Sequence, residues 1–397
     1  MKIVHTADWH MSADTLEKCH RATSFLIDRC RELKPDLQFI AGDFWDRSQV
    51  LNHKSAVLPA VEVVKTCAEI SPVVIVAGNI SHDAQGSLEI LRELRTRYPV
   101  YTAHEPESIL LVEDSDGVRF VRCPSDEARH ARAMIHCMPY LSKSSLLSGE
   151  ERSAAAADDH ARGRLRVLFR KFNALQNGFA GPKLLVGHLT VAEAVFPSGQ
   201  LASLGEFAIP RADLELVGAD YYALGHIHLN KSLGSRMWYS GSIYHNDFGE
   251  TGPRYCNTVL LEGHDITVER IEIPSIPLSR HDVRIDAAGE VIDEHPAKDW
   301  QGAELRIRLY LAPEQLHLVR DEELRERYSG AHTYKIERMI IPHERARTEE
   351  LVTARHLRDK IAIWARATQT EIPDRIYGLA DELEETIASW IASGGGR

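Results

Sequence analysis

Short apolar segments recur along the first 240 residues, and each has the length of a β-strand. Nearly every position in them is apolar, so we expect both faces of the sheets that they form to be covered. The predicted strands are Lys2–Ala7, Leu37–Ala41, Val73–Ala77, Lys183–Val186, Tyr221–Leu224 and Met237–Ser240.

Amphipathic segments of helical length separate several of these strands. They are Leu16–Leu33, His53–Ile70 and Ser87–Arg97, in which apolar residues recur with helical spacing. Strands that alternate with helices are typical of an α/β fold, in which helices cover the sheets in layers.

A longer helix is expected around an apolar stripe that runs from Leu165 to Leu175. Basic residues cluster on the same segment: Arg162, Arg164, Arg166, Arg170 and Lys171. Such a cluster forms either a solvated helix face or a contact with the phosphate backbone of a nucleic acid, and the sequence leaves both interpretations open.

The composition changes near Pro274 and Pro277, which lie in a segment typical of a linker. Beyond it, the pattern predicts strands at Glu304–Leu311 and Thr333–Ile341 on either side of a charged helix from Pro313 to Arg327, a compact βαβ-like module. Two amphipathic helices follow. We therefore predict a main domain over residues 1–272, a smaller α+β cap domain over 273–342 and a helical region over 343–397.

Charge and cysteine content limit the classes of function. The 397 residues include 58 Asp and Glu against 47 Lys and Arg, a formal net charge of −11, so contact with a nucleic acid has to be local. The six cysteines are widely spaced without a C-x-x-C pair, which favours reduced structural thiols. No segment has the pattern of a membrane span or signal peptide, so we expect a cytoplasmic protein without membrane contact.

Ligand-type residues follow five of the predicted strands. Four strands end in glycine and then such a residue, and the first is followed directly by an Asp-Trp-His run. The set is Asp8, His10, Asp43, Asn79, His188, His226 and His228. Because the carboxyl ends of strands in an α/β sheet share one edge, these side chains are expected to converge. Oxygen and imidazole donors without thiolate suit Mn²⁺, Fe or Zn²⁺, and seven donors suit two ions that share a carboxylate.

These motifs resemble those of the calcineurin-like metallophosphoesterases: D-x-H, G-D-x-x-D, G-N-H-D/E, G-H and G-H-x-H. Within that superfamily the chain is most similar to the SbcD nucleases. This narrower likeness rests on four segments: His5–His10, Met138–Leu141, Tyr239–Ser242 and Asp247–Glu250. It implies a layered core of mixed sheets flanked by helices. It also implies two bound divalent ions, which we expect to be Mn²⁺. DNA is the implied substrate, an SbcC-like SMC-type ATPase is the implied partner, and the implied assembly is a homodimer.

The resemblance also implies roles for individual residues. It assigns Asp8, His10 and His228 to one ion and Asn79, His188 and His226 to the other, with Asp43 bridging the two. Asp46 matches the second acidic position of its motif and is expected beside the ligands or on the surface. Arg47 could meet a phosphate of the DNA or pair with a neighbouring carboxylate.

One motif departs from the pattern. Where the family has Gly-Asn-His-Asp, this chain has Gly78-Asn79-Ile80-Ser81-His82-Asp83. Either a two-residue insertion has moved the proton-donating histidine to His82 and the loop returns its imidazole to the substrate, or the role is lost. We expect that the histidine is retained in altered form.

The function expected from the resemblance is a dimetal-dependent DNA nuclease, exonuclease or endonuclease, that acts with the ATPase in DNA repair and recombination. One alternative keeps the centre and changes the substrate to a small phosphoester. The other is a catalytically weakened scaffold that binds DNA ends. Cleavage of duplex DNA separates the nuclease hypothesis from both alternatives.

Overall fold

The computed structural model describes residues 1–48, 50–147, 154–194, 207–250, 252–263, 265–286, 288–293, 300–341 and 349–392. The chain forms two compact units. One comprises Met1–Arg280, Ala297–Arg306 and Gly330–Tyr334, and the other His281–Pro296, Ile307–Ser329 and Lys335–Arg397. Of the described helices, none is long and apolar enough to cross a bilayer.

Two sheets form the centre of the first unit. The first has the order β15 (Asp265–Ile273), β14 (Arg254–Glu262), β1 (Lys2–Thr6), β2 (Leu37–Ala41), β3 (Val73–Val76), β4 (Val100–Ala103). The second has the order β12 (Lys231–Ser232), β13 (Met237–Tyr239), β11 (Tyr221–Gly225), β8 (Lys183–His188), β7 (Ala131–Met138), β5 (Glu107–Asp114), β6 (Gly117–Arg122). Strands β1 to β4 run parallel, as do β7, β8, β11 and β13, and the remaining neighbours pair antiparallel. Both sheets are therefore mixed.

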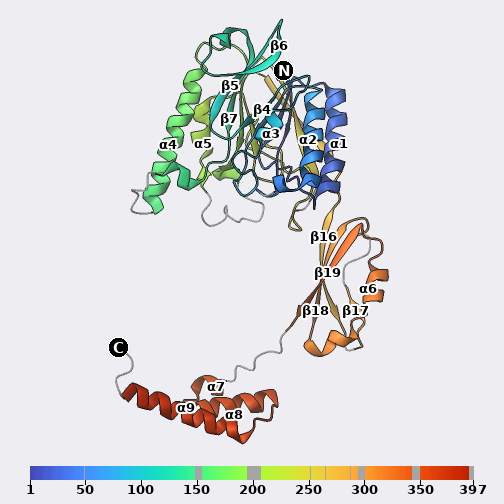
Figure 1. Ribbon diagram of the computed structural model, residues 1–397, viewed down its shortest axis with the longest axis vertical. Helices are drawn as coiled ribbons and strands as arrows, with labels where there is room; N and C mark the ends of the chain where they lie inside the picture. The colour runs from blue at the N-terminus through green and yellow to red at the C-terminus, as the bar shows by residue number, and fades with distance from the viewer. Residues whose placement is uncertain are drawn as a thin grey trace. The chain divides into compact units, whose positions relative to one another are not determined.

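The two sheets pack face to face. Phe39 and Val74 from the first sheet share one buried cluster with Ile135 and Leu184 from the second. A cluster on the outer face of the first sheet joins it to α1 (Leu16–Leu33) and α2 (Lys54–Ala68), and one on the outer face of the second joins it to α4 (Ala154–Leu175). Figure 1 shows α4 on one side of the sheets and α1 and α2 on the other. The order helix, sheet, sheet, helix confirms the layered α/β core.

The predicted strands and most of the predicted helices are present within one or two residues of the expected bounds. The helix expected over Ser87–Arg97 is wrong in extent, because only α3 (Glu89–Arg92) is helical. The carbonyl oxygen of Ser87 accepts a hydrogen bond from the indole of Trp45, and the Leu91 N–H donates to Leu88 in a tighter turn. Tertiary contacts here replace the regular helical bonds.

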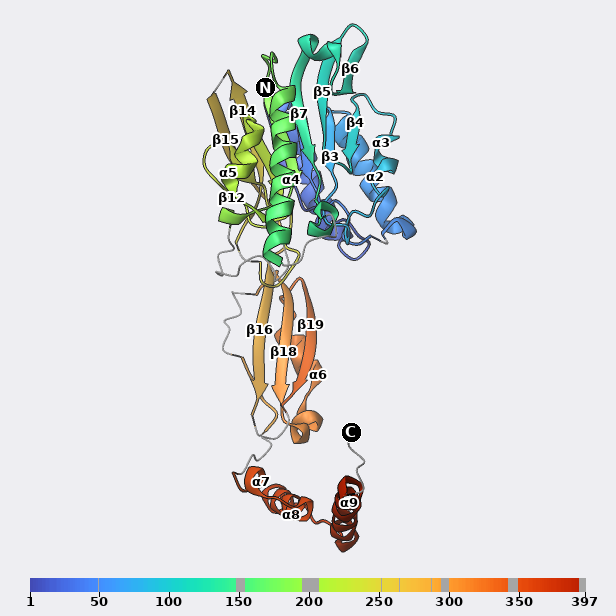
Figure 2. The same ribbon diagram turned by 90° about the vertical axis from the view of Figure 1, so that its left-hand side faces the viewer.

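The cap contains a third sheet with the order β17 (Val291–Ile292), β16 (Leu278–Ile285), β18 (Glu304–Leu311), β19 (Thr333–Ile340). Figure 2 shows β16, β18 and β19 side by side. The His332 N–H donates to Ala303 and the Ile341 N–H to Leu311, so β18 and β19 run in the same direction. The connection between them is a 3₁₀ helix at Pro313–Leu318 followed by α6 (Asp321–Arg327), in place of one continuous helix.

The remaining elements are short or terminal. Strands β9 (Thr190–Val191) and β10 (Ala208–Ile209) pair with each other, and α5 (Arg211–Leu214) follows β10. The chain continues after the cap into α7 (Glu349–Thr353), α8 (Leu357–Thr368) and α9 (Asp374–Ala392). Residues 148–153, directly before α4, and residues 393–397 at the C-terminus fall outside the described residues.

Candidate metal centre

The seven predicted ligand residues lie at the carboxyl ends of strands from both sheets. Asp8 and His10 follow β1, Asp43 follows β2 and Asn79 follows β3, all in the first sheet. His188 ends β8, and His226 and His228 follow β11, in the second sheet. The set therefore does not share one sheet edge, and its members meet where the edges of two packed sheets adjoin.

The backbone is strained at four of these positions. Asp8, His10, Asp43 and His226 have φ angles of 53°, 43°, 48° and 95°. Only two further residues other than glycine have positive φ in the part of the chain that the structure describes. Such conformations cost free energy in L-amino acids, so their concentration here indicates a functional constraint on where these side chains point.

Glycines allow the strand ends to approach one another closely. A Cβ atom on Gly42 would lie 2.1 Å from the His188 ring, and one on Gly78 would lie 2.0 Å from the Asp43 carboxylate. On Gly225 it would lie 1.8 Å from the carbonyl oxygen of Ala41. Gly42 also has φ of +87°, whereas at the other two glycines the requirement is close approach.

Asp43 lies at the middle of the cluster. Its Oδ2 is 3.3 Å from His188 Nε2 and 4.0 Å from His10 Nε2. Its Oδ1 accepts a 2.7 Å hydrogen bond from the backbone N–H of Asn79. The carboxylate thus faces histidines from both sheets, which is the position that a bridging ligand requires.

The other donors form two groups around this carboxylate. In one, His10 Nε2 lies 3.0 Å from His228 Nε2, with Asp8 close by. In the other, His226 Nδ1 lies 3.3 Å from His188 Nε2. Within each of the sets Asp8–His10–His228 and Asp43–His188–His226, candidate ligand atoms lie within 4.8 Å of one another.

Two observations indicate that these residues are suited to bind cations. Asn79 Oδ1 is buried without a hydrogen-bond partner among the described residues, although a buried amide oxygen is normally paired. Burial disfavours the charged form of His188, yet the charge and hydrogen bond of Asp43 outweigh it and raise the pKa of His188 to about 9. The Asp43 carboxylate thus favours positive charge at His188, one of the candidate ligands.

His82 returns to the cluster despite the altered motif. The backbone N–H groups of His82 and Asp83 both donate to Asn79 O at 2.8 Å, so the loop forms a tight turn. His82 Nδ1–H donates to the carbonyl oxygen of Asp46 at 2.5 Å, which leaves Nε2 3.9 Å from Asp43 Oδ2. The ring centroids of His82 and His10 are 4.7 Å apart. The structure thus places the His82 ring beside the candidate ligands, and its role as proton donor stays a prediction.

The side chain of Asp83 holds this turn in place through hydrogen bonds. Its buried carboxylate accepts hydrogen bonds from the backbone N–H groups of Phe44, Trp45 and Gly78. It therefore ties the loop after β3 to the loop after β2, and so fixes the start of the segment that carries His82.

The other residues with a predicted role are Asp46, Arg47 and the arginines of α4, and they differ in exposure and in ion pairing. The Asp46 carboxylate pairs with Arg47, whose side chain is 72% exposed and also lies 3.8 Å from Asp14. On α4, Arg166 donates to Asp213 at 2.8 Å, Arg162 is half-buried and Arg170 is exposed. Arg166 and Arg170 are thus both exposed, and Arg166 is already paired with Asp213.

Two residues to which the sequence assigned no role contact a predicted ligand. Glu250 accepts a hydrogen bond from His228 Nδ1–H, and the buried Arg254 donates to Glu250. Burial would raise the pKa of Glu250, but the His228 and Asn246 hydrogen bonds and the Arg254 charge outweigh it and lower that pKa. Glu250 belongs to a motif that carried the resemblance, which was the only available signal.

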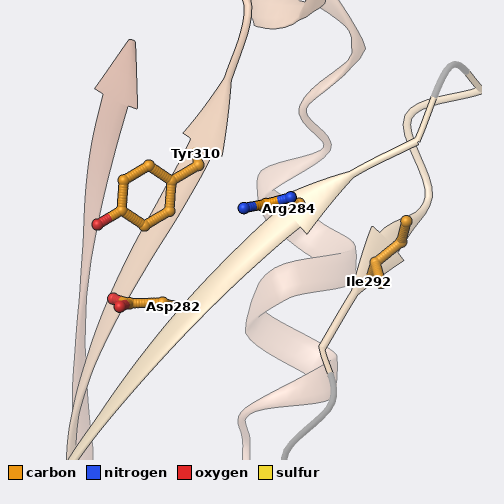
Figure 3. Close-up of a pocket in the computed structure, with 4 residues that line it drawn as sticks. All are labelled: Asp282, Arg284, Ile292 and Tyr310. Carbon is orange, nitrogen blue, oxygen red and sulfur yellow. The ribbon is translucent and has the colours of Figure 1, made fainter. Parts of the chain in front are cut away.

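The centre opens into a cavity of about 310 Å³, whose lining includes His10, Asp43, Asn79, His82 and His228. A larger cavity, about 440 Å³, lies on the cap sheet. Figure 3 shows Asp282 and Arg284 on β16, Ile292 on β17 and Tyr310 on β18 around it. The larger cavity has one carboxylate, Asp282, and no histidine in its lining. The smaller cavity is therefore the candidate metal site, because its lining contains the cluster of carboxylate, amide and imidazole donors.

Comparison with known proteins defines the class. Residues 1–230, more than half of the chain, match the calcineurin-like phosphoesterase family, so this chain belongs to that family. Its members are metal-dependent hydrolases of phosphoesters, and the His and Asp clusters suit divalent metal binding.

A particular relative is the SbcD component of the nuclease SbcCD from Rhodobacter capsulatus. The two chains are 28% identical over 304 residues, which covers 70% of this chain and 71% of the relative. Likeness to solved structures is more distant. A protein described as a 5′-nucleotidase from Staphylococcus aureus gives a TM-score of 0.40 at 13% identity, over 76% of this chain and 59% of that one. A dimetal phosphatase from Danio rerio gives 0.39 at 12% identity, over 69% and 98%.

Proposed function

We propose that this protein is a two-metal DNA nuclease that hydrolyses phosphodiester bonds. Asp8, His10 and His228 hold one divalent cation, Asn79, His188 and His226 hold the other, and Asp43 bridges them. The donors combine carboxylate, amide oxygen and imidazole, which suit Mn²⁺, Fe or Zn²⁺, and among these we expect Mn²⁺.

The observation that carries the proposal is convergence. Side chains that are separated by up to 220 positions meet around Asp43, and the buried Asn79 Oδ1 lacks a partner among the described residues. Strained backbone at four ligand positions and glycines that admit no Cβ support the same conclusion, because folding alone requires neither.

Bound divalent cations would lower the pKa of a water nucleophile and neutralise charge that develops on the phosphate. The chain itself performs two tasks. The carbonyl oxygens of Ala41 and Asp46 accept the Nδ1–H of His188 and His82, so Nε2 of each ring points inward. His82, when protonated, donates from Nε2 to the leaving oxygen.

The likeness to the SbcD component of nuclease SbcCD supports DNA as substrate and an SbcC-like SMC-type ATPase as partner in repair and recombination. In the domain division that we propose, residues 1–272 form the nuclease domain and 273–342 the DNA-binding cap. Residues 343–397 dock the ATPase, since Trp364, Leu379 and Leu383 on α8 and α9 are 45–57% exposed. We further propose a cytoplasmic homodimer in which Arg47 and Arg170, both exposed, contact phosphates, with lesser parts for Arg162 and Arg166.

The alternatives are less well supported. A phosphatase for small phosphoesters would use the same centre, but the relative carries the name of a nuclease. A scaffold without activity would not need His82, whose Nε2 faces the Asp43 carboxylate.

The proposal is tested by cleavage of linear and hairpin DNA in Mn²⁺. We expect the wild type to cut and Asp43→Asn to lose activity by at least about 10³-fold, because the bridging charge is removed. Asp28→Asn, an exposed residue on α1, is the matched control and should cut normally. Activity of Asp43→Asn equal to the wild type would contradict the bridging role, and cleavage of small diesters without cleavage of DNA would favour the phosphatase.

A further inference from the structure

A buried charged pair contacts His228 at Nδ1, the ring nitrogen that does not face His10. His228 Nδ1 contacts Glu250 Oε1, while Glu250 Oε2 accepts from the Asn246 N–H at 3.0 Å and from Arg254 Nη1 at 3.2 Å. The Glu250 side chain is 14% exposed and that of Arg254 is 3% exposed. Both oxygens of the carboxylate are therefore engaged, Oε1 by one partner and Oε2 by two.

This arrangement dictates the tautomer of His228. A carboxylate only accepts hydrogen bonds, so the ring nitrogen that faces Glu250 must carry the proton. In the neutral ring the other nitrogen, Nε2, then has a free lone pair, and this nitrogen lies 3.0 Å from His10 Nε2 among the candidate ligands. Imidazole binds a cation only through an unprotonated nitrogen.

Arg254 fixes the position of the pair. Besides Glu250, its Nη1 donates to the carbonyl oxygen of His228 at 3.0 Å and to Ser242 Oγ at 3.2 Å. The guanidinium thus holds both the backbone of the histidine and the carboxylate that orients its ring.

We propose that Glu250 and Arg254 are positioning residues that hold His228 in the Nδ1–H form. They thereby set the cation affinity of the first site, which is formed by Asp8, His10 and His228. This inference rests on the metal centre proposed above and adds two residues to it. Loss of a hydrogen-bond partner behind a ligating histidine typically weakens metal binding by roughly 10- to 100-fold.

The substitution Glu250→Gln tests the inference because it changes charge and not shape. Its amide oxygen can accept the hydrogen bonds from Asn246 and Arg254, and its amide nitrogen then faces His228 Nδ1 as a donor. Nδ1 must become the acceptor, so the proton moves to Nε2, where it blocks the cation.

Two measurements detect this change. In the metal-free protein labelled with ¹⁵N-histidine, at a pH at which the His228 ring is neutral, ring-nitrogen NMR reports its tautomer, and its signals are identified by their loss in His228→Gln. Calorimetric titration with Mn²⁺ alone reports the affinity of each site. We expect the Nδ1–H form in the wild type and the Nε2–H form in Glu250→Gln, with the first site roughly 10- to 100-fold weaker and the second little changed.

The control is Glu262→Gln, the same change at an exposed position on β14, which should leave both readouts unaltered. Should Glu250→Gln fail to fold, the wild-type spectrum still decides, since an Nε2–H His228 there overturns the inference. Two Mn²⁺ bound with equal affinity by wild type and Glu250→Gln would overturn the inference and leave the proposed function standing. A wild type that binds no Mn²⁺ would overturn both.

Discussion

Replacement of His82 by alanine should impair the cleavage of DNA far more than the binding of metal. His82 Nε2 lies 3.9 Å from Asp43 Oδ2, and Nδ1 is committed to the Asp46 carbonyl oxygen, so Nε2 is the nitrogen that can reach an ester oxygen in the cavity. A positioned general acid contributes about 10²–10⁴ to the rate, equivalent to about 2.7–5.5 kcal/mol of activation free energy. We expect kcat on DNA to fall within this range in His82→Ala.

The assay compares two leaving groups. A DNA alkoxide needs a proton as it departs, whereas p-nitrophenolate does not, so His82→Ala should lose at least about tenfold more activity on DNA than on bis(p-nitrophenyl) phosphate. Calorimetry with Mn²⁺ should still find two ions. The control is His20→Ala, an exposed histidine on α1. An equal loss on both substrates, or the loss of one bound ion, would refute the role of proton donor and make His82 a ligand.

Two further predictions concern folding. Gly225→Ala should lower the free energy of unfolding by about 3 kcal/mol in urea titrations, because its Cβ would lie 1.8 Å from the Ala41 oxygen. The control is Gly163→Ala, at an open position in a helix, which should leave that free energy unchanged or raise it. Equal effects would contradict the close approach. Burial lowers the pKa of His136 to about 4. Between pH 6.5 and 4, His136 is therefore protonated in the unfolded chain and still neutral in the folded chain. Stability should fall through this window by about 2–3 kcal/mol more in the wild type than in His136→Gln, and parallel pH profiles would refute this cause.

Much of the core could be predicted from sequence because β1, β2 and β3 are buried on both faces and therefore form continuous apolar segments. Strands β6 and β15 have exposed positions, so no such segment marks them. In β7 the apolar pattern is interrupted by His136, which is buried through hydrogen bonds to Ser108 and Gln176. Those partners lie 28 and 40 positions away, and a local pattern does not reveal them.

The ligand residues could be predicted because each follows a strand, and strand ends converge in this class of fold. The sequence did not reveal that they come from two sheets, nor that Gly78 and Gly225 are required for close approach. Nor did it assign a role to Glu250, whose contact with His228 spans 22 positions and crosses strands β12 and β13.

Anomalous diffraction from crystals soaked in Mn²⁺ shows whether this centre binds two cations. We expect two peaks about 3.5–4 Å apart on either side of Asp43, one against Asp8, His10 and His228 and the other against Asn79, His188 and His226. A single peak, peaks elsewhere in the molecule, or no bound Mn²⁺ would contradict this expectation.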